Sequence, residues 1–467
     1  MSATYMNNFE VTHFRKLFPI LKTTLHQQTL VYFDNGATTQ KPISVIEAEK
    51  SFYCTANANV HRASYTLAAN ATTQFEQTRE KTQAFINAKS SSEIIWTKGC
   101  TESINLVAQS WGLNNLNSND VIVLSYAEHH ANIVPWQQIA KQTGAIIKVL
   151  PLTAQGIIDV AQLTQVICEQ TKIVCCSHIS NVVGKINPIE DIIARAKSVG
   201  AKTLIDGAQA IANIRVDVQA LDCDFYVFSS HKMYGPTGVG VLYGKAALLS
   251  AMPPYQSGGE MIESVSFAET HFQKIPFKFE AGTPNIAGVV ALAKAIELIE
   301  DYQLNNNLLY KKQLLEYAFA QLKAIPTLTF LFKEQPDISL FTFTLAENNQ
   351  DIASALDLFG ISVRVGRHCA MPLYEYLGVN GAIRLSLAPY NTYEEVDYVV
   401  NKLNELVNKK HILPSVNTST SDISTNNSDD NAESLIAQFS QLKGWDTKHR
   451  ALMLLGKRLQ RMDKSER

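Results

Sequence analysis

A lysine placed directly after an apolar segment is the first residue of this sequence that could do chemistry. Residues 225–229 (FYVFS) predict a strand, Lys232 follows on a Ser-His-Lys turn, and glycines within 235–240 shape the return into the next strand. Open α/β sheets bind ligands at the carboxyl ends of their strands, and a lysine amine there can form a Schiff base with a carbonyl cofactor. Taken alone, a surface lysine beside a glycine turn is the more common case.

A carboxylate upstream of the lysine supplies a chemical partner for it. Asp206 ends the apolar segment 202–206 (KTLID), and Gln209 follows three residues later. Pyridoxal phosphate (PLP) needs a lysine for its aldehyde and a carboxylate that keeps its pyridine nitrogen protonated, so that the ring is an electron sink. Lys232 and Asp206 provide that pair, although an aspartate in this place could instead cap a helix.

Loops after other predicted strands carry three further candidates. Thr101 opens a helix after a glycine turn, where free backbone N–H groups and the helix dipole attract an anion. His129 lies just beyond the strand at 121–125 and could stack on a planar cofactor. Asn181 follows the strand at 172–177, where its amide could bond a phenolic oxygen. Each of the three could equally be an ordinary loop residue.

An alternation of strands and helices must position these residues. Fully apolar strands indicate a sheet covered on both faces, and strand–helix alternation predicts an α/β fold with a mainly parallel sheet. After about residue 290, two helices, shorter strands and a last helix predict a smaller α+β domain. The predicted strands are 93–97, 121–125, 146–150, 172–177, 202–206, 225–229, 238–243, 338–345, 361–365 and 382–387; the predicted helices are 101–112, 132–144, 160–167, 189–200, 287–303, 307–323 and 392–408.

A composition break separates the end of the chain from the rest. Residues 414–434 are rich in Ser, Thr, Asn and Asp and have almost no large apolar side chains. The apolar surface that they could bury is therefore too small to offset the conformational entropy that ordering would cost. The segment beyond is too short to be an independent domain. We predict an N-terminal arm at 1–30, a PLP-binding large domain at 31–290, a small C-terminal domain at 291–411, a flexible linker at 412–434 and a tail at 435–467.

Composition excludes several classes of protein. The net charge is -2 and the pI about 6.6, which argues against a globally basic nucleic-acid-binding protein. The first residues contain no apolar run that could act as a signal peptide, and no segment is apolar enough to cross a membrane. The seven cysteines show no metal-binding or redox spacing. We therefore expect no nucleic-acid or membrane partner, no metal, and a cytoplasmic location.

The order and spacing of the motifs resemble class V, fold-type I PLP enzymes, and closely the cysteine desulfurases of the SUF type. This resemblance covers roughly residues 10–410 and implies an obligate homodimer with its PLP site near the subunit interface. The matching stretches are YFDNGATTQKP (32–42), NVHRASYTLA (59–68), EHHANIVPW (128–136), SHISNVVG (177–184), DGAQA (206–210), SSHKMYGPTGVG (229–240), FEAGTPN (279–285), RVGRHCAMP (364–372) and RLSLAPYNT (384–392).

The resemblance also implies a role for each matching residue. Lys232 matches the Schiff-base lysine, Cys369 the nucleophilic cysteine, and Arg384 the arginine that clamps the substrate carboxylate. Positive neighbours before Cys369 favour its thiolate, which is the reactive form. The implied catalytic residues are Lys232, Cys369 and His129; the implied cofactor contacts are Lys232, Asp206, Gln209, Asn181, His129, Thr101, Ser229, His231 and, from the other subunit, Thr283; the implied substrate contacts are Arg384, Arg364, His61 and Asn181.

Three features depart from the family or extend beyond it. Cys100 stands where the family commonly has a hydroxyl residue, and Arg367 stands where SUF-type enzymes often have histidine. Residues 439–459 resemble the opening helices of SufE-type sulfur acceptors, although no cysteine follows Cys369. The remaining cysteines are interpreted as small buried core residues. We interpret 435–467 as a truncated SufE-like tail, which is either a shortened fusion or a tethering remnant; a plain amphipathic helix is the alternative.

The activity implied by the resemblance is that of a PLP-dependent cysteine desulfurase. It would convert L-cysteine to L-alanine and leave a persulfide on Cys369 for transfer to a SufE-type sulfur acceptor or to a scaffold of iron–sulfur cluster assembly. A selenocysteine lyase with the same site is one alternative. A catalytically silent iron–sulfur assembly scaffold is another, but intact Lys232, Asp206, Cys369 and Arg384 argue against it.

Overall fold

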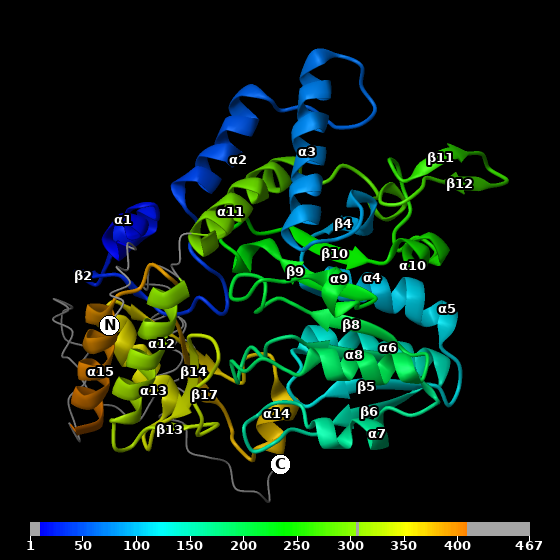
Figure 1. Cartoon of the computed structure of the whole chain (residues 1–467). Helices are drawn as coiled ribbons and strands as arrows, with labels where there is room; N and C mark the ends of the chain where they lie inside the picture. Colours follow the sequence, from blue (N-terminus) through cyan, green and yellow to red (C-terminus); the bar gives the residue numbers. More distant parts are fainter. Residues whose placement is uncertain (1–9, 305–307, 409–467) are drawn as a thin grey trace, which may run out of the picture. The chain divides into compact units, whose positions relative to one another are not determined.

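The structure is a computed structural model, and it describes residues 10–304 and 308–408 (Figure 1). The predicted linker at 412–434 and the predicted tail at 435–467 lie outside the described residues. Within the described ranges, no helix is long and apolar enough to cross a membrane.

A seven-stranded sheet organises the larger part of the chain. All of its neighbouring strands are parallel except β10, which runs antiparallel to both of its neighbours. The mainly parallel sheet predicted from the strand–helix alternation is therefore confirmed. In spatial order the strands are β4 (Ile94–Thr97), β10 (Gly240–Gly244), β9 (Phe225–Ser229), β8 (Lys202–Asp206), β7 (Thr171–Ser177), β5 (Val121–Ser125) and β6 (Ile146–Leu150).

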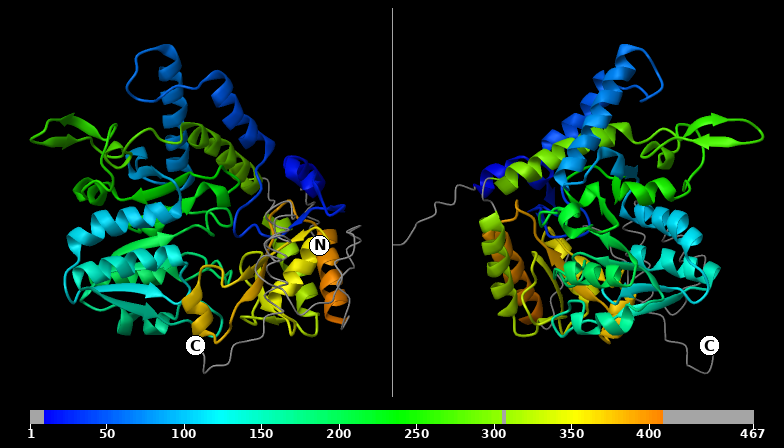
Figure 2. Two further views of the ribbon diagram at one scale, coloured as in Figure 1. Left: turned by 180° about the vertical axis from the view of Figure 1, so that it is seen from behind. Right: turned by 45° about the vertical axis from the view of Figure 1, so that its right-hand side comes forward.

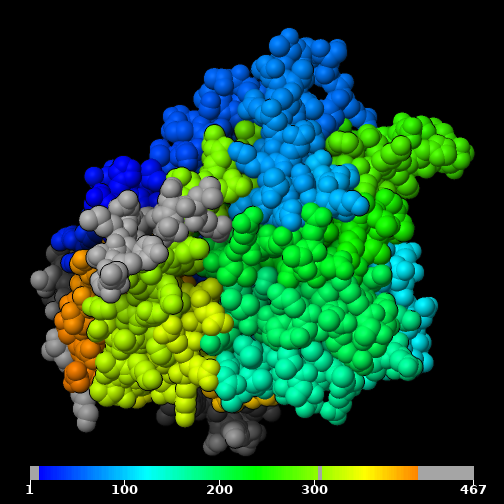
Figure 3. All heavy atoms as spheres, in the orientation of Figure 1, coloured from blue at the N-terminus to red at the C-terminus, as the bar shows by residue number. Residues whose placement is uncertain are grey.

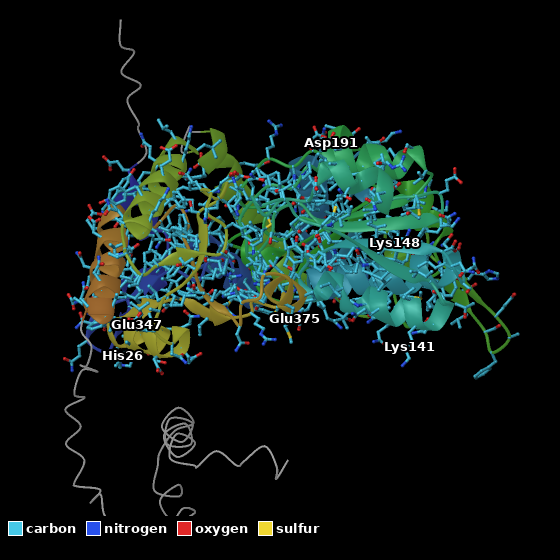
Figure 4. All side chains as sticks on the ribbon, turned by 90° about the horizontal axis from the view of Figure 1, so that it is seen from below. His26, Lys141, Lys148, Asp191, Glu347 and Glu375 are labelled. Atoms are coloured by element: carbon cyan, nitrogen blue, oxygen red, sulfur yellow. The ribbon has the colours of Figure 1, made fainter. Side chains whose placement is uncertain are left out.

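Helices cover both faces of this sheet, as the fully apolar strands require. Successive strand residues alternate between two cores: Cys175 packs in one and Cys176 in the other, and both are fully buried. Figure 4 shows Asp191 and Lys141, from the helices on the two faces, on opposite sides of Lys148 in β6. One face carries α2 (Ile43–Thr55), α3 (Thr66–Phe85), α8 (Ile189–Ser198) and α11 (Ile286–Leu304), and the other α4 (Cys100–Leu106), α6 (Val134–Thr143) and α10 (Ala246–Ala251).

The C-terminal part is an α+β unit built on an antiparallel sheet. Its strand order is β13 (Thr329–Phe330), β14 (Leu340–Thr344), β17 (Ala382–Ser386) and β16 (Arg364–Gly366). Its helices are α12 (Leu308–Lys323), α13 (Asn349–Leu358) and α15 (Tyr393–Asn408), and both views of Figure 2 show α12 and α15 side by side. β3 (Val31–Tyr32), near the start of the chain, pairs with β15 (Ile361–Ser362) of this part. The domain limits given above stay predictions.

Several local expectations need correction. The helix predicted at 101–112 extends to Asn115 through a π-helical segment, Val107–Gly112, followed by the short α5 (Leu113–Asn115). The helix predicted at 160–167 is only a 3-10 turn (Val160–Gln162) and α7 (Leu163–Val166). Cys54 is exposed and Cys168 half-buried, so their assignment to the core is wrong. The remaining elements include α1 (Val11–Lys16), β1 (Thr24–Leu25), β2 (Gln28–Thr29), α9 (Val218–Leu221), β11 (Ile262–Val265), β12 (Thr270–Phe272) and α14 (Met371–Tyr376).

Parallel pairing brings polar strand ends to one edge of the sheet. Ser177 at the end of β7 pairs with Asp206 at the end of β8, and Asp206 pairs with Val227 two residues before β9 ends. Parallel strands run in one direction, so their carboxyl ends share an edge. The loops that follow these strands therefore begin close together.

The segment before α2 is anchored by an aromatic cluster. Phe18 is fully buried, with its ring 4.6 Å from that of Tyr390 and 5.3 Å from that of Phe14. Replacement by alanine should lower the free energy of unfolding by about 3–5 kcal/mol, since it deletes a buried ring and leaves a cavity. Urea unfolding at one protein concentration measures this. Ile20→Ala is the matched control because Ile20 is 42% exposed; equal losses in both variants would contradict the packing of Phe18.

Candidate active site

A cavity of about 310 Å³ lies at this edge of the sheet. It gathers side chains that are far apart in the sequence, from the loops after β5, β7, β8 and β9 and from the C-terminal part of the chain. The residues predicted from the sequence that line it are Thr101, His129, Asn181, Asp206, Gln209, Ser229, His231, Lys232, Arg364, Cys369 and Arg384.

Lys232 sits at the end of a 3-10 turn that directly follows β9. Burial lowers the pKa of its amine, and the Asp206 carboxylate partly opposes that effect. The turn is held through the carbonyl oxygen of His231, which accepts hydrogen bonds from Thr39 N at 3.0 Å, Thr38 Oγ1 at 3.0 Å and Lys41 Nζ at 3.1 Å. The turn that carries Lys232 is therefore fixed, and the amine is shifted toward its neutral, nucleophilic form.

The groups predicted to hold a phosphate lie around the start of α4. The backbone N–H of Cys100 donates to Ser229 Oγ at 2.8 Å, which leaves the Ser229 hydroxyl proton free to donate elsewhere. Thr101 is exposed and lines the cavity. Burial, followed by the charge of Lys232, lowers the pKa of His231 to about 4. An approaching dianion would favour the charged imidazole and oppose this shift.

His129 is fixed in one tautomer. The backbone N–H of Ala131 donates to His129 Nδ1 at 3.1 Å, so the neutral ring carries its proton on Nε2. Burial, followed by the charge of Lys232, lowers the pKa of His129 to about 4. The ring is therefore neutral near pH 7.

Asn181 and Gln209, whose side-chain amides are predicted to contact the phenolic oxygen of the cofactor, each have one protein partner for the amide nitrogen. Asn181 Nδ2 donates to the carbonyl oxygen of His368 at 2.8 Å, and Gln209 Nε2 donates to that of Gly36 at 2.7 Å. A side-chain amide has two N–H donors. One donor on each residue can therefore still serve a ligand.

Arg384 is buried at the wall of the cavity, and sequence reasoning missed the residue that orients it. Asp34 Oδ1 lies 3.4 Å from Arg384 Nη2, and the Asp34 carboxylate accepts a bidentate pair from Arg364 Nε at 3.0 Å and Nη2 at 2.8 Å. Arg384 Nη1 donates to the carbonyl oxygen of Asn181 at 2.9 Å, while its buried Nε has no hydrogen-bond partner among the described residues. Only the DNGATT sequence around Asp34 could have drawn attention to it.

Cys369 is exposed on a loop in an unusual backbone conformation. Both His368 and Cys369 have positive φ angles, 50° and 55°, a region that costs free energy for residues with a Cβ. Hydrogen bonds to both carbonyl oxygens help to hold the loop: His130 N donates to that of Cys369 at 2.7 Å, and Asn181 Nδ2 donates to that of His368. Cys369 thus lines the cavity and also faces solvent.

Three predicted or noted residues do not line this cavity. His61 bonds Glu76 Oε1 at 2.9 Å and lines a separate cavity of about 280 Å³ with Arg62. Thr283 is exposed and lines another of about 170 Å³. Arg367 donates to Asn380 Oδ1 at 2.5 Å. The role of Thr283 in the site of the other subunit stays a prediction.

Glu128, next to His129, is a buried carboxylate that sequence reasoning missed. Its partners are neutral donors: Ser125 Oγ at 2.5 Å, Asn132 Nδ2 at 2.8 Å and Ser177 N at 3.0 Å. Burial raises the pKa of Glu128 to about 7, although these hydrogen bonds oppose the shift. Glu128 thus ties the ends of β5 and β7 to the turn that carries His129. Within the described ranges, no group of acidic, histidine or cysteine side chains could hold a metal ion.

The sheet topology and this cavity define a PLP-type α/β protein, and the comparisons with known proteins give the family. Residues 31–399 match the aminotransferase class-V family, to which this chain therefore belongs. A protein named cysteine desulfurase from Shigella sonnei (strain Ss046) is 47% identical over 400 residues, which are 85% of this chain and 98% of that protein. A cysteine desulfurase of Escherichia coli (strain K12 / DH10B) is 46% identical over the same shares of the two chains.

Solved structures give the same result. The cysteine desulfurase CsdA from Escherichia coli superposes with a TM-score of 0.80 at 42% identity, covering 86% of this chain and 100% of that one. A cysteine desulfurase from Thermococcus onnurineus NA1 also has a TM-score of 0.80, at 33% identity, covering 86% and 99% of the two chains. The predicted PLP-enzyme fold is confirmed.

The raised pKa of Glu128 makes folding stability depend on pH. The folded state holds the proton up to about pH 7, whereas the ordinary value is 4.5, so the contribution of Glu128 to the free energy of unfolding should fall as pH rises between them. At 1.36 kcal/mol per pH unit the loss is at most about 3 kcal/mol. Buried histidines with lowered pKa values, such as His129 and His231, contribute a slope of the opposite sign. Glu128→Gln should therefore remove only the Glu128 contribution, and the free energy of unfolding of the variant should rise more steeply with pH than that of wild type.

Urea unfolding at about pH 5 and about pH 8, at one protein concentration, measures the slope. Glu334→Gln, at an exposed position, is the control and should keep the wild-type slope. The same slope in Glu128→Gln as in wild type would show that Glu128 does not titrate in this window.

Proposed function

We propose that this chain is a PLP-dependent cysteine desulfurase that converts L-cysteine to L-alanine and leaves the sulfur as a persulfide on Cys369. The observation that carries the proposal is that Lys232, Asp206, Arg384 and Cys369 line one cavity. A lysine and a carboxylate suit PLP, an arginine suits a substrate carboxylate, and a cysteine suits sulfur chemistry. The identity of 47% to a protein named cysteine desulfurase supports the same conclusion.

The side chains of the cavity fit PLP. Asp206 and Lys232 would hold its ring nitrogen and aldehyde, and Ser229, Thr101 and His231 offer donors for its phosphate. The unpartnered Nε of Arg384 fits an anionic group brought in by a ligand, since a buried donor without a partner costs free energy. When bound, PLP withdraws electrons from the Cα of the amino acid and so weakens the Cα–H bond.

Lys232 moves the proton that this weakening releases. Burial lowers the pKa of its amine, which favours the neutral form that can accept the Cα proton. The short turn after β9 restricts where the amine can reach. Lys232 thus keeps the proton on Nζ inside the cavity, where it can be returned to the substrate.

Arg384 and its partners orient the substrate. The guanidinium is held by Asp34 on one side and by the carbonyl oxygen of Asn181 on the other. A planar fork fixed in this way can bind a carboxylate in one orientation. Arg364, held by the same Asp34, is exposed and adds positive charge at the cavity entrance. L-cysteine would then enter with its carboxylate directed to Arg384.

Cys369 accepts the sulfur. Its thiolate attacks the sulfur of L-cysteine, an S–S bond forms, and the Cβ–S bond of the substrate breaks. The substrate carbon takes the bonding electron pair and the proton of the original thiol, so that L-cysteine and a thiolate give L-alanine and a persulfide without an outside oxidant. The exposure of Cys369 leaves the terminal sulfur open to an acceptor.

The proposal includes a homodimer. Thr283 lies outside the cavity of its own chain, and α2 and α3 leave large apolar side chains exposed. The hairpin of β11 and β12 also projects from the surface in Figure 3, and its Phe267 is fully exposed. A second subunit would cover such surfaces. The exposed apolar residues of α2 and α3 are Ile43, Ile46, Tyr53 and Leu67.

The sulfur acceptor and the location of the enzyme are further parts of the proposal. A SufE-type acceptor, or a scaffold of iron–sulfur assembly, would take sulfur from Cys369, and selenocysteine would be a second substrate of the same site. The assignment to the SUF type and the acceptor-like tail at 435–467 remain predictions. All seven cysteines are free thiols, which supports a reducing, cytoplasmic compartment.

Substitution of Cys369 should separate sulfur chemistry from cofactor binding. Cys369→Ala should bind PLP and L-cysteine but release at most about a hundredth of the wild-type L-alanine, because the sulfur has no acceptor. Alanine and sulfide assays with a thiol reductant measure this, and a parallel assay with selenocysteine tests the second substrate. Cys168→Ala, outside the cavity, is the control. Alanine formation at the wild-type rate in Cys369→Ala would refute the persulfide step.

Removal of residues 412–467 tests the tail. All the side chains that line the cavity belong to the described residues, which end at position 408. The shortened chain should therefore keep PLP binding, dimerisation and basal turnover, and should differ only in its response to an added SufE-type acceptor. Absorbance, light scattering and the alanine assay measure these properties. Loss of PLP binding on truncation would show that the last 56 residues belong to the catalytic fold.

A further inference from the structure

Cys100 lies against Asp206 at the wall of the cavity. Its Sγ is 3.3 Å from Asp206 Oδ1, its residue is only 7% exposed, and it lines the cavity together with Lys232. Cys100 is held there because it begins α4 and its backbone N–H donates to Ser229 Oγ. A thiol is thus fixed beside the carboxylate that the proposed function assigns to the PLP ring nitrogen.

The thiol is the donor in this contact. Burial, and after it the negative charge of Asp206, raise the pKa of Cys100 well above its usual value, so the group stays an S–H at neutral pH. Asp206 Oδ1 also accepts from the backbone N–H of Ala208 at 2.9 Å. In the part of the chain that the structure describes, no hydrogen bond to Asp206 Oδ2 is found beside these two to Oδ1. Both contacts of the carboxylate therefore fall on one oxygen, and the other is left for a ligand.

We propose that Cys100 is a positioning residue that sets how much negative charge Asp206 presents to the ring nitrogen of PLP, an inference that rests on the proposed function. Each hydrogen bond to a carboxylate stabilises its charge and lowers its affinity for a proton. A thiol is a weak donor, whereas a hydroxyl is a strong one. Cys100 therefore holds Asp206 in place while drawing less charge from it than a serine or threonine would.

The side chain at position 100 should thus change how strongly Asp206 stabilises the protonated ring nitrogen of PLP. With no donor, as in Cys100→Ala, Asp206 keeps more charge and should stabilise the protonated ring nitrogen more strongly. With a stronger donor, as in Cys100→Ser, Asp206 should stabilise it less. The ring nitrogen should therefore become less protonated in the order alanine, cysteine, serine. A role in packing alone predicts no such order.

The first experiment detects the hydrogen bond without using the ring. Infrared difference spectra of the full chain, wild type minus Cys100→Ala, isolate the S–H stretching band of Cys100. The band should lie at lower frequency than that of an exposed thiol, and it should move to higher frequency in Asp206→Asn, where the acceptor carries no charge. The same frequency in wild type and in Asp206→Asn would overturn the proposed contact.

The second experiment reads the ring nitrogen directly. Wild type, Cys100→Ala and Cys100→Ser are loaded with PLP labelled with ¹⁵N in the ring, and the ¹⁵N chemical shift is measured. It should move toward the protonated value in Cys100→Ala and away from it in Cys100→Ser. Cys175 is a buried thiol in β7, the strand next to the one that ends at Asp206. Cys175→Ala is therefore the control and should leave the ¹⁵N chemical shift unchanged.

The outcomes separate this inference from the function on which it rests. Identical ring shifts in wild type and both Cys100 variants would overturn the role of Cys100 while leaving the enzyme assignment intact. A wild-type protein that binds no PLP would instead overturn the proposed function. If Cys100→Ala does not fold, Cys100→Ser against wild type still decides the inference, because its shift must then move away from the protonated value.

Discussion

The parallel pairing of β7, β8 and β9 is the constraint on which the site depends. Their register places Ser177 beside Asp206 and brings Lys232, three residues past the end of β9, to the same edge. Side chains alternate between the two faces of a sheet, so a slip of one residue would turn Asp206 away. Backbone hydrogen bonds deep in the sheet thereby fix the separation of an acid and an amine that are 26 positions apart in sequence.

Burial then sets the charges at this edge. Lys232, His129 and His231 all have lowered pKa values because the surrounding protein disfavours their charged forms. The cavity is therefore lined by bases shifted toward neutrality until an anion enters. Burial also lowers the pKa of Arg384, and the Asp34 carboxylate opposes this shift. A guanidinium nevertheless keeps its charge at neutral pH, and Asp34 supplies its counter-charge. The binding of anionic groups can thus change the protonation of Lys232, His129 and His231, while Arg384 stays charged.

The sequence revealed the features that depend on local pattern. Apolar runs predicted the strands of the central sheet to within one or two residues, and the strand-end positions of Asp206 and Lys232 pointed to the site. The partnership of Asp34 with the two arginines could not be predicted in this way, because it joins residues more than 300 positions apart. Glu128 was missed for a related reason: an isolated glutamate before two histidines gives no sign of burial.

The loop of Cys369 shows how binding and sulfur chemistry are connected in the proposed enzyme. Asn181 accepts a hydrogen bond from Arg384 through its backbone oxygen and donates one to the carbonyl oxygen of His368 through its side chain. One residue therefore joins the proposed substrate clamp to the loop that bears the nucleophile. Positive φ angles of this kind cost of order 1–3 kcal/mol each and persist only where neighbouring contacts hold them. Any movement of Arg384 toward a carboxylate would act on Asn181, and through it on a strained loop whose cysteine faces both the cavity and the solvent.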